Sequence, residues 1–364
     1  MSKIVTCEQV SRGHVDKICD QISDAIVSDC LRHDRESRVA VECLIKNNTV
    51  VIAGEITSKH EPDCAKLVGQ VFERVGITDQ YDRANVRTLI TRQSPDIAQG
   101  VDKGGAGDQG VMYGYATNET PELLPIPFAV STRFLELLRD VKASMLRPDA
   151  KAQVSYDYES GKITTFLCSV QHTADSEAED FRGIIESLMV LTAAEYGLNS
   201  DFEKLINPTG MFVVGGSNAD TGVTGRKLAC DTYGGVGRIG GGALSGKDPS
   251  KVDRSAAYMA RKIAVDLVTG GYCDKCEVQI AYAIGKAEPV SVSVDTFGTV
   301  RCCPKCIDKY VETNYDLTPR GIIRFLHLLD VDYRDVAYGG HFGKNWLPWE
   351  IDEELAEDIY GGEE

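Results

Sequence analysis

The sequence predicts an α+β fold of three similar units, because a β-hairpin followed by a helix occurs three times along its 364 residues. In the first unit, residues 38–46 and 49–57 are rich in β-branched amino acids and flank Asn47-Asn48, a pattern typical of a two-residue hairpin turn. A helical spacing of apolar residues follows at residues 64–75. The length also exceeds that of one simple core, which favours several units.

The same order of elements recurs twice more in the chain. Strand, turn, strand and helix are predicted at residues 152–158, 159–161, 162–170 and 178–196, and again at residues 277–284, 285–289, 290–297 and 319–329. The amino acids of the three units differ, so the repeat is one of structural pattern.

Composition and charge narrow the class of protein. Apolar residues make up 43% of the chain and charged residues 26%, as in soluble globular proteins. There is no run of 18 apolar residues and the first segment is polar, so we expect no membrane span, no secretory signal and a cytoplasmic location. The net charge of −16 argues against nucleic acid and membrane surfaces as partners. A polyanionic substrate would therefore need locally gathered cations or metal ions.

A glycine-rich segment at residues 233–253 is the strongest sign of phosphate binding. Its G-x-G-x-x-G spacing, which begins at Gly235, argues only weakly for a dinucleotide site, because more glycine follows where a helix should open. Its G-x-x-x-x-G-K spacing at residues 241–247 is followed by Asp248, where a P-loop requires serine or threonine. Many glycines nevertheless let backbone N–H groups approach phosphate oxygens.

A helix is predicted to follow this segment, with Asp248 as its cap, Pro249 as its first residue and its end near Val268. The N-terminus of a helix attracts anions, and a carboxylate there can hold a metal ion. The charged residues around this start are Lys247, Lys251 and Asp253. We favour phosphate binding over the alternative of an ordinary glycine-rich connection.

Two further clusters lie nearer the N-terminus. His14 and Asp16 precede an amphipathic helix, a position where such residues are typical of capping. If Asn47-Asn48 is a two-residue turn, Glu42 pairs with Ala53, and Glu55 becomes its diagonal neighbour on the same face. Two carboxylates on one face favour a cation between them, and a solvated outer face is the alternative.

Ordered motifs along nearly the whole chain carry a family resemblance. They are GHVDK at 13–17, GEIT at 54–57, QSPDI at 93–97, GAGDQG at 105–110, GYATNET at 114–120, RPDAK at 147–151, INPTG at 206–210, TGRK at 224–227, DTYGG at 231–235, GGGALSGKDPSKVDRSAAY at 240–258 and GHFG at 340–343. With them the chain resembles the S-adenosylmethionine synthetases, or methionine adenosyltransferases.

The resemblance implies three α+β domains related by pseudo-threefold symmetry. It also implies synthesis of S-adenosylmethionine from ATP and L-methionine, followed by hydrolysis of the tripolyphosphate to pyrophosphate and phosphate. Two magnesium ions and potassium are the implied cofactors, and a homodimer or dimer of dimers with active sites between subunits is the implied assembly. The alternative is a non-catalytic, nucleotide-binding regulatory subunit of the same family.

The resemblance further implies a role for individual residues. The catalytic group is His14, Arg226, Lys247 and Lys251, with His14 beside the departing oxygen. The ATP-binding group is His14, Asp149, Lys151, Phe212, Asp220, Arg226, Lys227, Ala243 and Lys247, with Phe212 stacked on adenine. The methionine-binding group is Glu55, Gln93, Asp108, Asp220 and Lys251, while Asp16 and Asp253 match magnesium ligands and Glu42 a potassium ligand.

The family's segments are expected at residues 1–98, 105–215 and 216–350, with a mobile gate over the site at residues 99–107. This gate is shorter than is usual in the family. Four residues also depart from the family pattern, namely Arg12, Val15, Met211 and Ser217, where an acid, a proline, an arginine and a proline are common.

Two Cys-x-x-Cys pairs flank the third predicted hairpin, formed by Cys273 and Cys276 and by Cys303 and Cys306. An antiparallel hairpin brings its two ends together, so the pairs are expected to meet there. A structural zinc site is one interpretation of this spacing, and four reduced thiols are the other.

Overall fold

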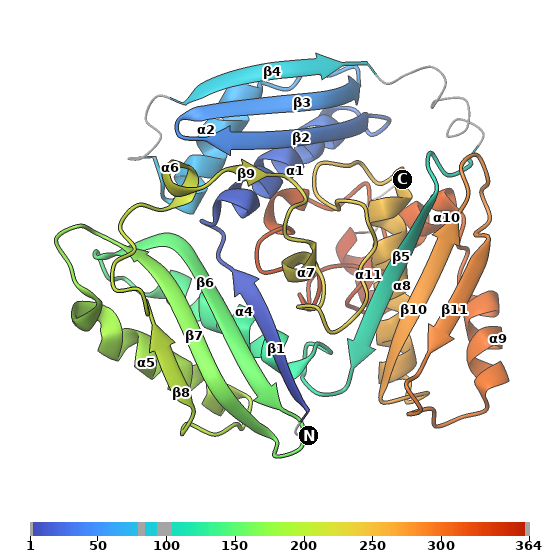
Figure 1. Cartoon of the computed structure of the whole chain (residues 1–364). Coiled ribbons are helices and arrows are strands. Elements are labelled where there is room, and N and C mark those ends of the chain that lie inside the picture. The colour runs from blue at the N-terminus through green and yellow to red at the C-terminus, as the bar shows by residue number, and fades with distance from the viewer. Residues whose placement is uncertain (1–2, 79–83, 93–103, 361–364) are drawn as a thin grey trace.

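The computed structural model describes residues 3–78, 84–92 and 104–360 and contains three β-sheets, each packed against its own helices (Figure 1). The predicted α+β class with three similar units is therefore confirmed. Within the described residues, no helix combines the length and the apolar character needed to cross a membrane.

The first sheet has the order β4-β3-β2-β9. Its elements are β2 (Arg38–Lys46), β3 (Thr49–Thr57), α2 (Cys64–Val75), β4 (Asn85–Thr91) and the short β9 (Gly222–Val223). The hairpin of β2 and β3 has the predicted register, since Glu42 pairs with Ala53. Strand β4 then returns parallel to β3 after α2, which gives a hairpin, a helix and a parallel third strand.

The second sheet repeats this arrangement with the order β1-β6-β7-β8. Its elements are β1 (Ile4–Val10), β6 (Leu146–Asp157), β7 (Lys162–His172), α5 (Ala178–Glu195) and β8 (Glu203–Ile206), with α4 (Ile126–Asp140) packed on β1 and β6. Here too the strand after the helix, β8, runs parallel to the second hairpin strand. Like β9 in the first sheet, β1 adds antiparallel to the first hairpin strand.

The third sheet has the order β11-β10-β5. Its elements are β5 (Gly110–Thr117), α8 (Val252–Thr269), β10 (Lys275–Tyr282), β11 (Ser291–Asp295), α9 (Pro304–Asn314) and α10 (Pro319–Phe325). Strand β5 again lies antiparallel beside the first hairpin strand, β10. The sheets therefore cut across the segments 1–98, 105–215 and 216–350, because β1, β5 and β9 each join a hairpin that is distant in sequence.

Helix α1 (Val15–His33) is buried on both of its faces. Ile18, Ile22 and Ile26 pack into the core as predicted, yet the polar face is buried as well, including Asp16 and Lys17. Burial of charge is costly unless each ion is paired. The polar face of this helix must therefore meet partners from the rest of the chain.

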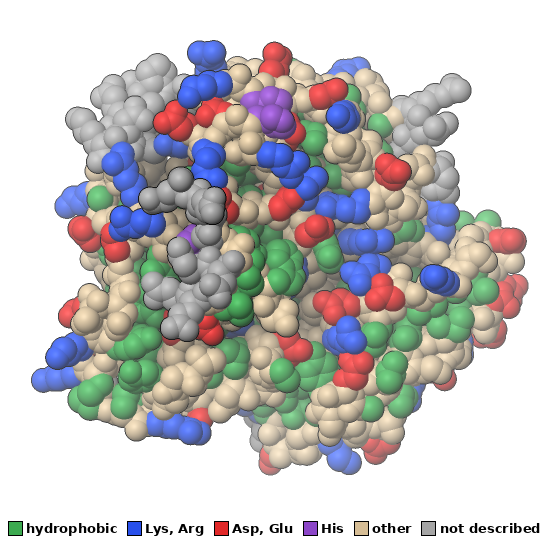
Figure 2. Space-filling model, turned by 180° about the vertical axis from the view of Figure 1, so that it is seen from behind, with side chains coloured by type: hydrophobic (Ala, Val, Ile, Leu, Met, Phe, Trp, Pro, Cys, Tyr) green, Lys and Arg blue, Asp and Glu red, His purple; other side chains and the backbone are tan. Residues whose placement is uncertain are grey.

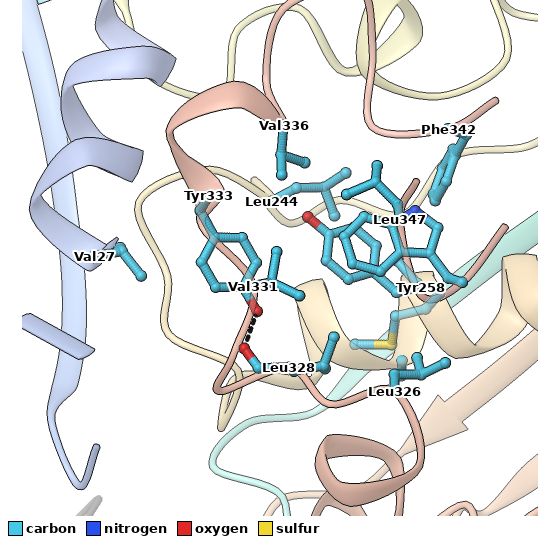
Figure 3. Close-up of a cluster of buried hydrophobic side chains, with 14 of the residues drawn as sticks. Val27, Leu244, Tyr258, Leu326, Leu328, Val331, Tyr333, Val336, Phe342 and Leu347 are labelled. Atoms are coloured by element: carbon cyan, nitrogen blue, oxygen red, sulfur yellow. Dashed lines mark hydrogen bonds between the residues drawn. The ribbon is translucent and has the colours of Figure 1, made fainter. Parts of the chain in front are cut away.

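The centre of the molecule is filled by the C-terminal part of the chain, which packs between α1 and α8 (Figure 3). Tyr258 stacks on Trp349 with ring centroids 3.7 Å apart, and the buried Tyr333 donates a hydrogen bond to the carbonyl of Leu328 at 2.6 Å. The remaining short elements are α6 (Gly216–Ala219), α7 (Leu228–Asp231), a 3₁₀-helix (Tyr333–Asp335) and α11 (Glu353–Tyr360). On the face opposite to that of Figure 1, acidic and basic side chains are interspersed (Figure 2).

Candidate active site

Three aspartates on one face of α1 hold loops from the C-terminal half of the chain. They are fully buried and spaced by four residues, so their side chains form a row along the helix. Asp16, Asp20 and Asp24 accept hydrogen bonds through Oδ1 from the backbone N–H groups of Val223, Gly225 and Gly246 at 2.9, 2.8 and 2.9 Å. Helix α1 thus fixes both segments that carry the predicted phosphate-binding residues.

Asp16 lies at the centre of a cluster of positive charge. Its carboxylate accepts a hydrogen bond from Nζ of Lys227 at 2.6 Å, and Nε of Arg226 lies 3.2 Å from Oδ1. Burial opposes ionisation of Asp16, but the hydrogen bonds from Lys227 and the Val223 backbone outweigh it and lower the pKa of Asp16. Arg226 also donates to the carbonyl of Thr221 at 2.6 Å, which holds its guanidinium beside this carboxylate.

His14 caps α1 and has only 4% of its surface exposed. Its Nδ1 accepts a hydrogen bond from the backbone N–H of Asp16 at 3.2 Å, which leaves the proton of the neutral imidazole on Nε2. Burial lowers the pKa of His14 to about 4, and the charge of Lys227 acts in the same direction. At neutral pH His14 is therefore uncharged and can donate one hydrogen bond from Nε2.

A second carboxylate, that of Asp253, lies in the first turn of α8 as predicted. It accepts a hydrogen bond from Nζ of Lys247 at 2.6 Å. Gly242 packs so closely that an added Cβ would lie 2.2 Å from Cγ of Asp253, and a Cβ on Gly225 would lie 2.4 Å from that of Ala243. These contacts join the two carboxylate clusters, at the starts of α1 and α8, through two glycine-rich segments.

Lys247 also extends the first sheet. Its backbone forms an isolated bridge with Ala40, which pairs with Glu55 on β3, so the three side chains lie in one row on one face. Glu42 lies two residues from Ala40 on the same face. Glu42 and Glu55 are both exposed on this face of the single chain.

The other residues expected to bind methionine are dispersed. Gln93 lies outside the described residues. Asp108 is exposed and its Oδ1 accepts a hydrogen bond from the backbone N–H of Gln109 at 2.7 Å. Asp220 is also exposed, with Oδ2 4.0 Å from Nη2 of Arg226, so it borders the Asp16 cluster.

The second sheet contributes Asp149 and Lys151 of β6 to the site. Asp149 accepts a hydrogen bond through Oδ2 from the backbone N–H of Gly216 at 2.7 Å. Burial raises the pKa of Asp149 to about 6, while this hydrogen bond and the charge of Lys151 oppose the rise. Lys151 pairs with Val10 of β1 and helps to lower the pKa of His14, after burial and Lys227.

Phe212 is half-buried on the segment that follows β8. Its backbone accepts a hydrogen bond from the N–H of His172 at 2.9 Å and donates one to Nε2 of His172 at 3.0 Å. A cavity of about 330 Å³ lies between the end of β7, which contributes His172, and the residues that follow Phe212, beginning with Val213. The neighbouring Met211, which departs from the family pattern, is exposed.

Asp248 and Lys251 correct the predicted start of the helix. Helix α8 begins at Val252 with Lys251 as its cap, and neither Asp248 nor Pro249 belongs to it. Asp248 instead accepts a hydrogen bond from the backbone N–H of Val39 at 2.7 Å and pairs with Nζ of Lys251. Its other oxygen accepts a hydrogen bond from the backbone N–H of Ser250 at 2.9 Å, so Asp248 caps the turn that precedes the helix.

Sequence reasoning missed a buried ionic network beneath these residues. Lys17 is fully buried and pairs with Asp231. Arg254, also fully buried, lies 2.8 Å from the carboxylate of Asp24 and donates to the carbonyl of Lys247 at 2.8 Å. The four-residue spacing of the α1 aspartates was the only signal of this network in the sequence.

The four cysteines of the two Cys-x-x-Cys pairs do not meet at the base of the hairpin as expected, which argues against the zinc site and for reduced thiols. The hairpin does place Cys273 opposite Val300, but Cys303 and Cys306 lie beyond this point at the start of α9, where they are exposed. Cys276 is buried, and its thiol donates to the carbonyl of Ala264 at 3.6 Å. Within the described part of the chain, these thiols do not gather closely enough to share an ion.

The arrangement is suited to binding a polyanion together with metal ions. Arginine and lysine side chains converge on two carboxylates in a chain that is otherwise acidic, and oxygen ligands of this kind are preferred by magnesium. Buried backbone contacts fix both glycine-rich segments, so these groups are held in place before any ligand binds.

Comparisons with known proteins agree with this chemistry. Family models of S-adenosylmethionine synthetase match residues 2–95 for the N-terminal domain, 103–212 for the central domain and 214–351 for the C-terminal domain. A curated relative from Mesoplasma florum, named S-adenosylmethionine synthase, is 45% identical over 96% of this chain and 97% of its own. Another relative of the same name, from Sorangium cellulosum, is 45% identical over 97% of this chain and 89% of its own.

Proposed function

The chain belongs to the S-adenosylmethionine synthetase family, and from this premise we propose that it makes S-adenosylmethionine from ATP and L-methionine and then hydrolyses the tripolyphosphate to pyrophosphate and phosphate. The observation that supports this most directly is the pair of carboxylate–lysine contacts, Asp16 with Lys227 and Asp253 with Lys247.

In the proposed reaction the methionine sulfur attacks C5′ of ATP, and the C5′–O bond breaks with its electron pair leaving on the triphosphate. The thioether has no proton to lose, so no general base is required. The chain must instead stabilise charge on the departing oxygen, the task of preorganised donors and cations. His14 suits this task, because its Nε2–H can donate a hydrogen bond to that oxygen. Arg226, Lys227, Lys247 and Lys251 supply positive charge for the phosphates.

Magnesium would be held by Asp16 and Asp253. Both supply hard oxygen ligands, and each already stabilises an ammonium group at 2.6 Å, so a cation is favoured at each carboxylate. When bound, such ions neutralise the phosphate oxygens and orient the triphosphate. Lys227 and Lys247 would then be free to contact the phosphates directly.

The outer face of the first sheet is the proposed contact with a second copy of the chain. It exposes Leu44 and Leu89, at 41% and 66% of their surface, beside the carboxylates of Glu42 and Glu55. The Glu42 carboxylate can supply at most two oxygens to a potassium ion, so further ligands would come from the partner subunit. Glu55 would bind the amino group of methionine in the same interface, in the row that ends at Lys247.

The test is methionine-dependent release of pyrophosphate and phosphate from ATP, with the sulfonium product identified by mass spectrometry. Equal phosphate release with and without methionine, and no sulfonium product, would contradict the proposal. Nucleotide binding without turnover would instead support the regulatory subunit.

A further inference from the structure

A cavity of about 200 Å³ lies apart from the carboxylate–lysine clusters, between the C-terminal ends of α2 and α4 and the start of β6. About half of its wall is apolar, with Val10, Leu135, Leu138, Val141 and Leu146 among the lining residues. A cavity of roughly 150 Å³ is known to hold a benzene ring. This one is therefore large enough for a ring or short chain that carries one polar group.

One side of the cavity is strongly basic. Arg12, Arg139 and Arg147 line it together with a single acid, Glu136. Three of these groups already have partners: Glu136 accepts a hydrogen bond from Arg133 at 3.2 Å, Arg139 donates to Asp140 at 2.8 Å, and Arg147 is also engaged. In a chain of net charge −16, three arginines at one small cavity are an unusual concentration.

Arg12 is half-buried, and within the described residues no carboxylate lies within ion-pair distance of its guanidinium. Burial lowers the pKa of Arg12, and the like charges of Arg139 and Arg74 add to the effect. Arg74, next to the cavity residues Val75 and Gly76, has a buried Nη2 without a hydrogen-bond partner among the described groups, although its Nη1 donates to Asp335 at 2.9 Å. Buried cationic donors without partners are costly, and an anion would relieve that cost.

We propose that this cavity is a binding site for a small organic anion, a compact apolar body that carries a carboxylate or a phosphonate-like group. The apolar wall would take the body of the ligand, and the guanidinium of Arg12 would bind the anionic head by charge-assisted hydrogen bonds.

The site also adjoins the backbone that positions His14. The carbonyl of Ser11, which lines the cavity, accepts a hydrogen bond from the N–H of His14 at 3.1 Å, and the N–H of Ser11 donates to Ala150 at 2.9 Å. The carbonyl of Arg12 accepts from Nε2 of Gln21 at 2.8 Å. A ligand held by Arg12 therefore contacts the segment that leads into α1.

The experiment measures binding of benzoate, phenylphosphonate and the neutral benzamide to the full chain by calorimetry. We expect saturable binding of at least one anion, about tenfold tighter than benzamide, because one charge-assisted hydrogen bond contributes roughly that factor. Arg12→Gln should remove this preference, while Arg324→Gln, a control at an arginine with 83% side-chain exposure, should not. Val141→Phe, which fills the cavity, should weaken binding even if Arg12→Gln fails to fold.

Four results would overturn the proposal. The first is no saturable binding of either anion, and the second is benzamide binding as tightly as both anions. The third is anion affinity that is unchanged in Arg12→Gln. The fourth is competitive displacement of the anion by ATP, which would place the anion at the triphosphate site. Since binding is measured without methionine, these outcomes are independent of whether the chain makes S-adenosylmethionine.

Discussion

Asp24→Asn tests how firmly α1 must hold the glycine-rich segment that precedes α8. The substitution keeps an oxygen acceptor for the N–H of Gly246 but removes the negative charge that faces Arg254. Both side chains are fully buried and lie 2.8 Å apart, so the variant leaves a buried guanidinium without its counter-ion. Breaking a buried pair in this way typically costs about 3–5 kcal/mol.

The lower end of this range is expected for Asp24→Asn. Arg254 keeps its hydrogen bond to the carbonyl of Lys247, and its guanidinium still lies 4.1 Å from the centre of the Tyr333 ring. A loss of about 3 kcal/mol lowers the urea midpoint by roughly 1 M if the denaturant dependence is about 3 kcal/mol per M. The rate of product formation should fall as well, because Lys247 follows Gly246 directly.

The matched control is Asp330→Asn, which removes the carboxylate of the pair between Arg35 and Asp330. The Arg35 side chain is 60% exposed, and a pair of this kind contributes less than about 1 kcal/mol. The test compares the urea unfolding midpoints of the two variants with that of the unsubstituted chain. If Asp24→Asn shifts the midpoint no more than the control does, the buried pair does not stabilise this segment as argued.

Two further predictions concern single side chains of the site. Lys251→Met should leave a folded protein whose rate of product formation is about 100-fold lower, since loss of one preorganised cationic contact costs ~3 kcal/mol in the transition state; near-native turnover in a steady-state assay would contradict this role. The pKa of His14 is about 4 in the folded chain and about 6.5 in the unfolded chain, so between these pH values the unfolded state binds more protons. The free energy of unfolding therefore falls by up to about 3 kcal/mol as the pH drops from 6.5 to 4. His14→Gln should lack this part of the pH dependence, and an imidazole titration near pH 6.5 by NMR in the native protein would show the argument to be wrong.

Local sequence patterns were sufficient for the first hairpin and the helix that follows it. A two-residue turn at Asn47-Asn48 permits only one antiparallel register, so the pairing of Glu42 with Ala53 could be predicted from counting alone. The turn of the second hairpin contains Gly161, which has a positive φ, as a tight hairpin turn often requires. Such features depend on neighbours along the chain.

The start of α8 and the surroundings of α1 depended on segments far away in sequence. Asp248 followed by proline is a good local helix start. Its carboxylate instead accepts a hydrogen bond from the backbone N–H of Val39 in the first sheet, and the helix begins at Val252. An amphipathic helix usually exposes its polar face to solvent. The polar face of α1 is instead covered by backbone N–H donors from about 200 residues away, those of Val223, Gly225 and Gly246.

The sequence by itself determined the three hairpin–helix units, the register of the first hairpin and the motifs of the family. Only the tertiary structure decided which strand completes each sheet, how the aspartates of α1 are satisfied, and that Cys303 and Cys306 stand apart from Cys276. The physical reason is that turn geometry and helix periodicity act over a few residues. A buried charge or an unpaired strand edge must instead find its partner anywhere in the folded chain.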